Sequence, residues 1–128
     1  MVQQITKDIQ VSVHTSFQGK SFKDNELVNI FSYTVTIENK GEETVKLTDR
    51  FWSIYDALNG VEIVSGEGVV GQTPVIKPKD VYTYKSGCFL TAEIGAMKGF
   101  YTMINLDTFN QFKVYIPNFQ LTNPILSN

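Results

Sequence analysis

The stretch "IFSYTVTIEN", residues 30–39, decides the fold because its apolar and polar residues alternate from Phe31 to Glu38. Phe31, Tyr33, Val35 and Ile37 fall on one side of an extended chain, and Ser32, Thr34, Thr36 and Glu38 fall on the other. A period of two is typical of a β-strand that buries one face. The stretch "IQVSVHTSF", residues 9–17, repeats the pattern. Both segments are therefore predicted to be half-buried strands.

Extended patterns rich in β-branched and aromatic residues continue along the chain. They cover residues 44–58, 61–64, 81–86, 99–105 and 112–116. Asn59-Gly60 predicts a hairpin with a type I′ turn, in which both central residues have positive φ. The best helix candidate, residues 90–99, contains two glycines that would each destabilise a helix by about 1 kcal/mol, so no helix is predicted. Residues 117–128 contain two prolines and are expected to lie on the surface.

About seven short strands separated by turn residues predict an all-β fold, an immunoglobulin-like antiparallel β-sandwich. A closed barrel is the alternative. The 128 residues are expected to form one domain, residues 1–128, without internal repeats or low-complexity segments.

The charge pattern and the apolar runs narrow the function classes. A net charge of −2 with scattered single charges does not favour nucleic acid as a ligand. No apolar run approaches the roughly 20 residues that span a bilayer, and the N-terminal residues lack the apolar core of a signal peptide, so we expect a soluble cytoplasmic protein. One cysteine, Cys88, rules out an internal disulfide and suits a reducing compartment.

The stretch "GEGVVG", residues 66–71, has the spacing of a dinucleotide-binding loop, and "GEGVVGQT" nearly matches a P-loop. Those loops need a following helix, whose free N–H groups bind phosphate, but here Pro74 and Pro78 follow. The lysine of a P-loop is replaced by Gln72, and Glu67 would repel a pyrophosphate. The glycines are therefore predicted to shape a loop leaving a strand. Val69 and Val70 would either tuck under that loop or face a partner.

Candidate chemistry outside the loop is sparse. Arg50, the only arginine, precedes Trp52 by two positions; it is expected to clamp the loop or pair with Glu67 or Asp49. The alternative is an anchor for a peptide carboxylate or a phosphate. His14, the only histidine, is expected on the surface, so neither a catalytic triad nor a zinc site is predicted. Cys88 is expected to fill part of the core, as is Trp52.

The chain resembles the ApaG family, also called the DUF525 domain. The matching motifs are Arg50-x-Trp52-x-Ile54, "VSGEGVVGQTPVIKP" at 64–78, Tyr84-x-Ser86-Gly87 and Gly95-x-Met97-x-Gly99-x-Tyr101-x-Met103. The resemblance implies a fibronectin type III-like or immunoglobulin-like sandwich of the free-standing bacterial form. It also implies that Gly66, Gly68 and Gly71 belong to the family's glycine loop. The chain departs from the family's Pro-Gly-Glu at Pro78-Lys79-Asp80, which affects only a loop.

The resemblance implies two classes of function. The family's name associates it with diadenosine tetraphosphate metabolism and with cobalt and magnesium phenotypes, whereas similar eukaryotic domains lie inside F-box proteins and a DNA-polymerase-interacting protein. We expect a non-enzymatic module without a cofactor that binds a protein or peptide through Arg50, Gly66, Glu67, Gly68, Val69, Val70 and Gly71. A free sheet edge would also allow strand addition or a homodimer. The alternative is a protein that binds nucleotides or polyphosphates, or handles cobalt or magnesium.

Overall fold

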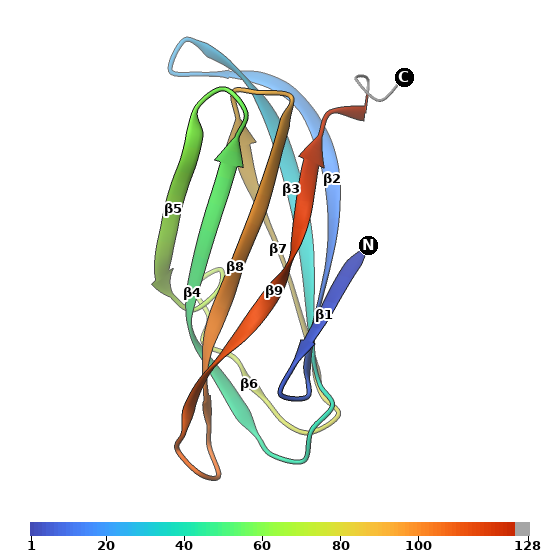
Figure 1. Cartoon of the computed structure of the whole chain (residues 1–128), viewed down its shortest axis with the longest axis vertical. Helices are drawn as coiled ribbons and strands as arrows, with labels where there is room; N and C mark the ends of the chain where they lie inside the picture. The colour runs from blue at the N-terminus through green and yellow to red at the C-terminus, as the bar shows by residue number, and fades with distance from the viewer. Residues whose placement is uncertain (125–128) are drawn as a thin grey trace.

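The computed structural model describes residues 1–124 and consists of two antiparallel sheets packed face to face (Figure 1). The strands are β1 (Val2–Thr6), β2 (Ile9–Lys23), β3 (Glu26–Asn39), β4 (Val45–Asp56), β5 (Gly60–Glu67), β6 (Val75–Ile76), β7 (Val81–Leu90), β8 (Ile94–Asn105) and β9 (Gln111–Thr122). One sheet has the order β1-β2-β3-β7, and the other has the order β5-β4-β8-β9, with β6 pairing beside β4. The predicted antiparallel β-sandwich is confirmed. The two strands beyond the expected seven are the N-terminal β1 and the two-residue β6.

The core lies between the sheets and follows the alternation of the sequence. On β3 every second residue from Phe31 to Ile37 is at most 5% exposed. Trp52 of β4 packs against Tyr33 and Phe119, with ring centroids 5.5 and 6.0 Å from its own. Aromatic contacts of this kind stabilise a core beyond the burial of their area. The predicted core role of Trp52 is confirmed.

Two local predictions were wrong. The β4–β5 hairpin exists, but positive φ occurs at Gly60 alone and not at Asn59. The turn is instead closed by the Asn59 N–H, which donates to the Asp56 carbonyl at 3.1 Å, and the left-handed Gly60 follows this turn as the first residue of β5.

Residues 117–122 do not lie on the surface as expected: they complete β9, and Phe119 and Leu121 are buried. Pro117 is accommodated because the register of β8 and β9 shifts there, so no ladder N–H is required. Pro124 is exposed at the end of the described chain, and residues 125–128 of this prediction lie outside the described residues.

The two long sides of the sandwich differ. On one side β1 lies beside β9, and the Tyr115 N–H donates to Thr6 Oγ1 at 3.2 Å. On the other side, within residues 1–124, β5 pairs only with β4 and β7 pairs only with β3, so each strand has one free edge, and residues of both strands line shared cavities. We call the gap between these edges the β5–β7 seam. Residues 1–124 form no helix with the length and the apolar composition that spanning a bilayer requires.

Candidate functional site

The glycine-rich stretch forms a turn that closes on itself where β5 ends. The Gly68 N–H donates to the Thr48 carbonyl at 2.8 Å. Val69 and Gln72 exchange two backbone hydrogen bonds of 2.8 and 2.9 Å, which leaves Val70 and Gly71 as the central residues of a tight turn. Their φ angles of 47° and 75° have the signs that a type I′ turn requires. We call residues 68–72 the glycine turn.

Gly68 is required by this geometry. Its φ is 66°, and a Cβ atom there would lie 2.2 Å from the Gln72 carbonyl oxygen. That oxygen is held by the Val69 N–H and cannot withdraw without breaking the turn. The prediction that the glycines serve the geometry of the chain is therefore explained at Gly68 by a close backbone approach.

The two valines of the turn have opposite roles. Val69 is 0% exposed and belongs to the core, whereas Val70 is 60% exposed. Val70 also has a left-handed backbone, which is strained for a β-branched residue and costs about 1–3 kcal/mol. Asparagine or glycine would fit this position better. An exposed apolar side chain is thus held in an unfavourable conformation at the tip of the turn.

Arg50 holds the glycine turn in place, as the first of its two interpretations expected. Its Nη1 donates to the carbonyl oxygens of Glu67 and Gly68 at 2.9 and 3.0 Å. The guanidinium lies over Gly66, where a Cβ atom would come within 3.1 Å of Nη2. The expected pairing with the carboxylate of Glu67 or Asp49 is absent: over residues 1–124 the single ion pair joins Lys20 and Glu93.

The charge of Arg50 is therefore not compensated by a carboxylate. The only buried side-chain polar atom without a hydrogen bond in residues 1–124 is Asn29 Oδ1, so the unbonded guanidinium nitrogens reach solvent. Partly buried arginine usually pairs with an anion, because its guanidinium presents five donors in a fixed plane. Arg50 can hold the turn and still accept an anionic group.

A cavity of about 300 Å³ opens beside Arg50 and the glycine turn, within the β5–β7 seam. Its walls are Tyr33, Arg50, Trp52, Ile54, Val64, Val69, Val70, Tyr84, Ser86 and Gly87. The Tyr84 hydroxyl is hydrogen-bonded to the Tyr101 hydroxyl. Burial raises the pKa of Tyr84 and of Tyr33, and the side chain of Ser86 partly offsets the shift of the Tyr33 pKa by a hydrogen bond. The cavity thus joins neutral hydroxyl groups, apolar walls and one cation.

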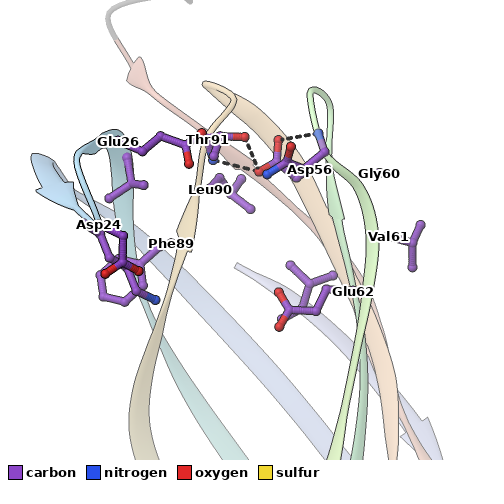
Figure 2. Close-up of a pocket in the computed structure, with 13 residues that line it drawn as sticks. Asp24, Glu26, Asp56, Gly60, Val61, Glu62, Phe89, Leu90 and Thr91 are labelled. Carbon is purple, nitrogen blue, oxygen red and sulfur yellow. Dashed lines mark hydrogen bonds between the residues drawn. The ribbon is translucent and has the colours of Figure 1, made fainter.

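A second cavity of about 410 Å³ lies near the β4–β5 turn (Figure 2). It continues the seam, because Ile54 lines both cavities. Figure 2 shows Glu62 of β5 pointing into the gap, whereas Val61 points away from it. Asp24 and Glu26 approach from the β2–β3 turn on the opposite wall. None of these three carboxylates has an ion-pair partner among the described residues. Lys23 also lines this cavity, with its Nζ 4.5 Å from the centroid of the Phe89 ring, so the carboxylates outnumber a single cation and this end of the seam has a negative balance of charge.

Asp56 in the same cavity has a structural role. Its carboxylate is buried and accepts hydrogen bonds from the N–H groups of Leu58, Asn59, Thr91 and Ala92 and from the Thr91 hydroxyl, at 2.7–3.3 Å. Burial alone would raise the pKa of Asp56, but the bonds from Leu58, Thr91 and Ala92 together lower it. Asp56 therefore joins the β4–β5 turn to the β7–β8 connection.

The arrangement does not provide the features of a phosphate-binding loop. No helix follows Gln72, and the N–H groups of Gly68, Val69 and Gln72 are already used within the protein. Phosphate loops instead direct a row of free N–H groups at the ligand. Residues 1–124 also contain no group of three or more His, Cys, Asp or Glu side chains that could hold a metal ion.

The remaining candidates match their predictions. His14 is exposed, and Cys88 packs against the core, where burial raises the pKa of its thiol to about 12. The structure adds residues that were not singled out as binding candidates: Tyr33, Tyr84 and Ser86 across the seam, and Glu62 on β5. Alternation places these side chains on the inner faces of their strands, but their positions along the seam depend on the pairing of β3 with β7 and of β4 with β5.

Comparison with known proteins places this geometry in context. The family model described as the ApaG domain matches residues 19–105. The chain is 43% identical to Protein ApaG of Caulobacter vibrioides, with 93% of this chain and 84% of the relative covered. It is 46% identical to Protein ApaG of Shewanella sediminis, with 91% of each covered.

Two solved structures share the fold. An X-ray structure of a structural-genomics target has a TM-score of 0.86 and 38% identity, covering 91% of this chain and 88% of that one. The crystal structure of the putative ApaA protein from Bordetella pertussis has a TM-score of 0.83 and 35% identity, covering 91% and 94%.

Proposed function

Because the chain belongs to the ApaG domain family, we propose that it is a non-enzymatic β-sandwich that binds a protein or peptide along the β5–β7 seam. The contact surface would comprise Val70 at the tip of the glycine turn and the Arg50 cavity beside it. Gly66, Gly68, Val69 and Gly71 serve this surface indirectly, by shaping the turn. Glu67 contributes its backbone carbonyl to the Arg50 clamp, while its side chain is exposed.

The observation that carries the proposal is the strained backbone of Val70 together with the exposure of its side chain. Natural proteins retain a strained backbone where the surroundings enforce it, and such positions cluster at binding and catalytic sites. Val70 combines a φ of 47° with an exposed apolar side chain at the mouth of a cavity. While Val70 is exposed, its strained backbone reduces the stability of the protein. Burial of the valine side chain by a partner would contribute favourable free energy to binding.

The proposal is tested by replacing Val70 with asparagine, which removes the apolar side chain and tolerates the left-handed backbone. Wild-type and Val70→Asn proteins would be immobilised, and proteins retained from an extract of the source cells would be quantified by mass spectrometry. We expect at least one protein whose retention falls about tenfold on the Val70→Asn column, because burial of a valine contributes about 1.5 kcal/mol.

Phe109 supplies the matched control. It is also apolar, exposed and left-handed, with a φ of 62°, but it lies in the β8–β9 connection. The Phe109→Asn column should therefore retain the same protein as the wild type. If every protein held by the wild type is held equally by Val70→Asn, the glycine turn is not a contact surface and the proposal fails.

A further inference from the structure

The β5–β7 seam combines a free strand edge with opposite charges at its two ends. Along the inner face of β4, Arg50, Trp52 and Ile54 lie in register with Gly66, Val64 and Glu62 of β5, respectively. The positive end is therefore at Gly66, the apolar middle at Val64 and the negative end at Glu62. The carboxylates of Asp24 and Glu26 reinforce the negative end from the opposite wall.

The edge of β5 is an exposed template for strand pairing. Alternate backbone N–H and C=O groups of an edge strand point away from its neighbour, and β5 runs over 8 residues with β4 as its only partner in the described chain. On the outer face Val61 and Ile63 are 62% and 56% exposed. A long apolar edge of this kind favours pairing with another extended chain.

From these features we propose that an extended peptide segment adds as a strand to the free edge of β5 and carries an acidic, an apolar and a basic residue at successive inward positions. This inference rests on the proposed function and names the class of partner. Residues in register on neighbouring strands point to the same face. The side chain opposite Gly66 therefore meets the Arg50 guanidinium, which crosses above the glycine toward the seam.

The other two inward positions follow from the same register. A side chain opposite Val64 enters the cavity of about 300 Å³ beside Trp52 and Tyr33, which suits an apolar group. A side chain opposite Glu62 lies in the cavity of about 410 Å³, among carboxylates that have no ion-pair partner in residues 1–124. A lysine or arginine is the complementary residue there.

The test uses synthetic peptides with blocked termini, in which threonine occupies the positions that alternate with the inward ones. One peptide carries aspartate, valine and lysine at its inward positions, a second carries aspartate at both charged positions, and a third carries lysine at both. We expect the mixed peptide to bind the wild type about fivefold more tightly than either like-charged peptide, as partly exposed charge pairs permit. Affinities would be measured by titration calorimetry.

A charge reversal on β5 makes the prediction specific. In Glu62→Lys the negative end of the seam is reversed, so the doubly acidic peptide should become the preferred ligand by a similar factor. Glu43→Lys changes the net charge equally on an exposed turn outside the seam and should leave the order of affinities unchanged. Hydrogen exchange detected by NMR should show slowed amides in Gly60–Glu67 when the mixed peptide is bound.

Several outcomes would overturn strand addition to β5. These are equal affinity for all three peptides, an order that Glu62→Lys does not change, and protection of β7 instead of β5. Protection of β5 that grows with protein concentration alone would show that a second copy of the chain occupies the edge. If the peptides fail while a Val70-dependent partner is found, strand addition fails and the proposed function stands; if no such partner is found, the proposed function itself fails.

Discussion

Val69→Asp is expected to unfold the protein at neutral pH, whereas Val70→Asp, one residue further, is expected to leave it folded. Val69 is 0% exposed within the core, so an aspartate there buries a charge without a partner. Such a change costs about 4 kcal/mol or more, a large part of the stability of a typical domain. Val70 is 60% exposed, and aspartate adopts the left-handed backbone more readily than valine.

The two variants would be compared by urea denaturation followed by circular dichroism. Val70→Asp should differ from the wild type by about 1 kcal/mol or less. Should both variants unfold at the same denaturant concentration as the wild type, Val69 is not part of the core and the description of the glycine turn is wrong. Binding tests on this turn must therefore alter Val70, since a change at the buried Val69 would report loss of folding.

Asp56→Ala is expected to lose about 3 kcal/mol of unfolding free energy at pH 7. The carboxylate accepts its hydrogen bonds from both the β4–β5 turn and the β7–β8 connection, and its removal leaves buried N–H groups without acceptors. Hydrogen bonds to a charged group contribute about 1.5–3 kcal/mol each, but bonds that share one acceptor are not additive. The β4–β5 turn and the β7–β8 connection, which Asp56 joins, would loosen together.

The same carboxylate gives a dependence on pH. Its folded pKa is lowered below the ordinary value of 3.8, so ionised Asp56 stabilises the folded state above that value. This stabilisation is lost as the pH falls through the folded pKa. The difference in stability between wild type and Asp56→Ala should therefore be full at pH 7 and shrink below about pH 4.

Urea denaturation at neutral and acidic pH checks this prediction. Asp49→Ala is the matched control, because Asp49 lies on the same strand but is exposed and makes no side-chain hydrogen bond with the described residues. It should change stability by no more than about 0.5 kcal/mol. A loss for Asp56→Ala as small as that of the control, or one that is unchanged at acidic pH, would contradict the structural role assigned to Asp56.

The fold could be predicted from sequence where a local pattern decides the structure. The alternation around Tyr33 identifies a strand and its buried face, and the prolines after Gly71 exclude a helix, because both effects act within a few residues. Turn type could not be predicted as reliably. A type I′ geometry was expected at Asn59-Gly60, but there the Asp56 carboxylate binds the N–H groups of Leu58 and Asn59, and positive φ is confined to Gly60. The type I′ signs of φ occur instead at Val70-Gly71.

The candidate site was predicted only in part. Arg50 and the glycine loop were identified, and the clamp interpretation is confirmed, yet its acceptors are backbone carbonyls and not a carboxylate. That detail depends on the register that sets Arg50 beside Gly66, which arises from pairing between distant segments. The division of Val69 and Val70 between core and surface likewise depends on the path of the turn, which composition does not specify.

The central claim is that the glycine turn uses the N–H groups of Gly68, Val69 and Gln72 within the protein and exposes the side chain of Val70. Amide hydrogen exchange of the free protein, resolved by NMR, tests it directly. We predict slow exchange at Gly68, Val69 and Gln72, whose N–H groups are bonded, and rapid exchange at Val70 and Gly71, whose N–H groups make no hydrogen bond with residues 1–124. Rapid exchange across all five residues would contradict the account, because the turn would then be open and its amides available to a ligand.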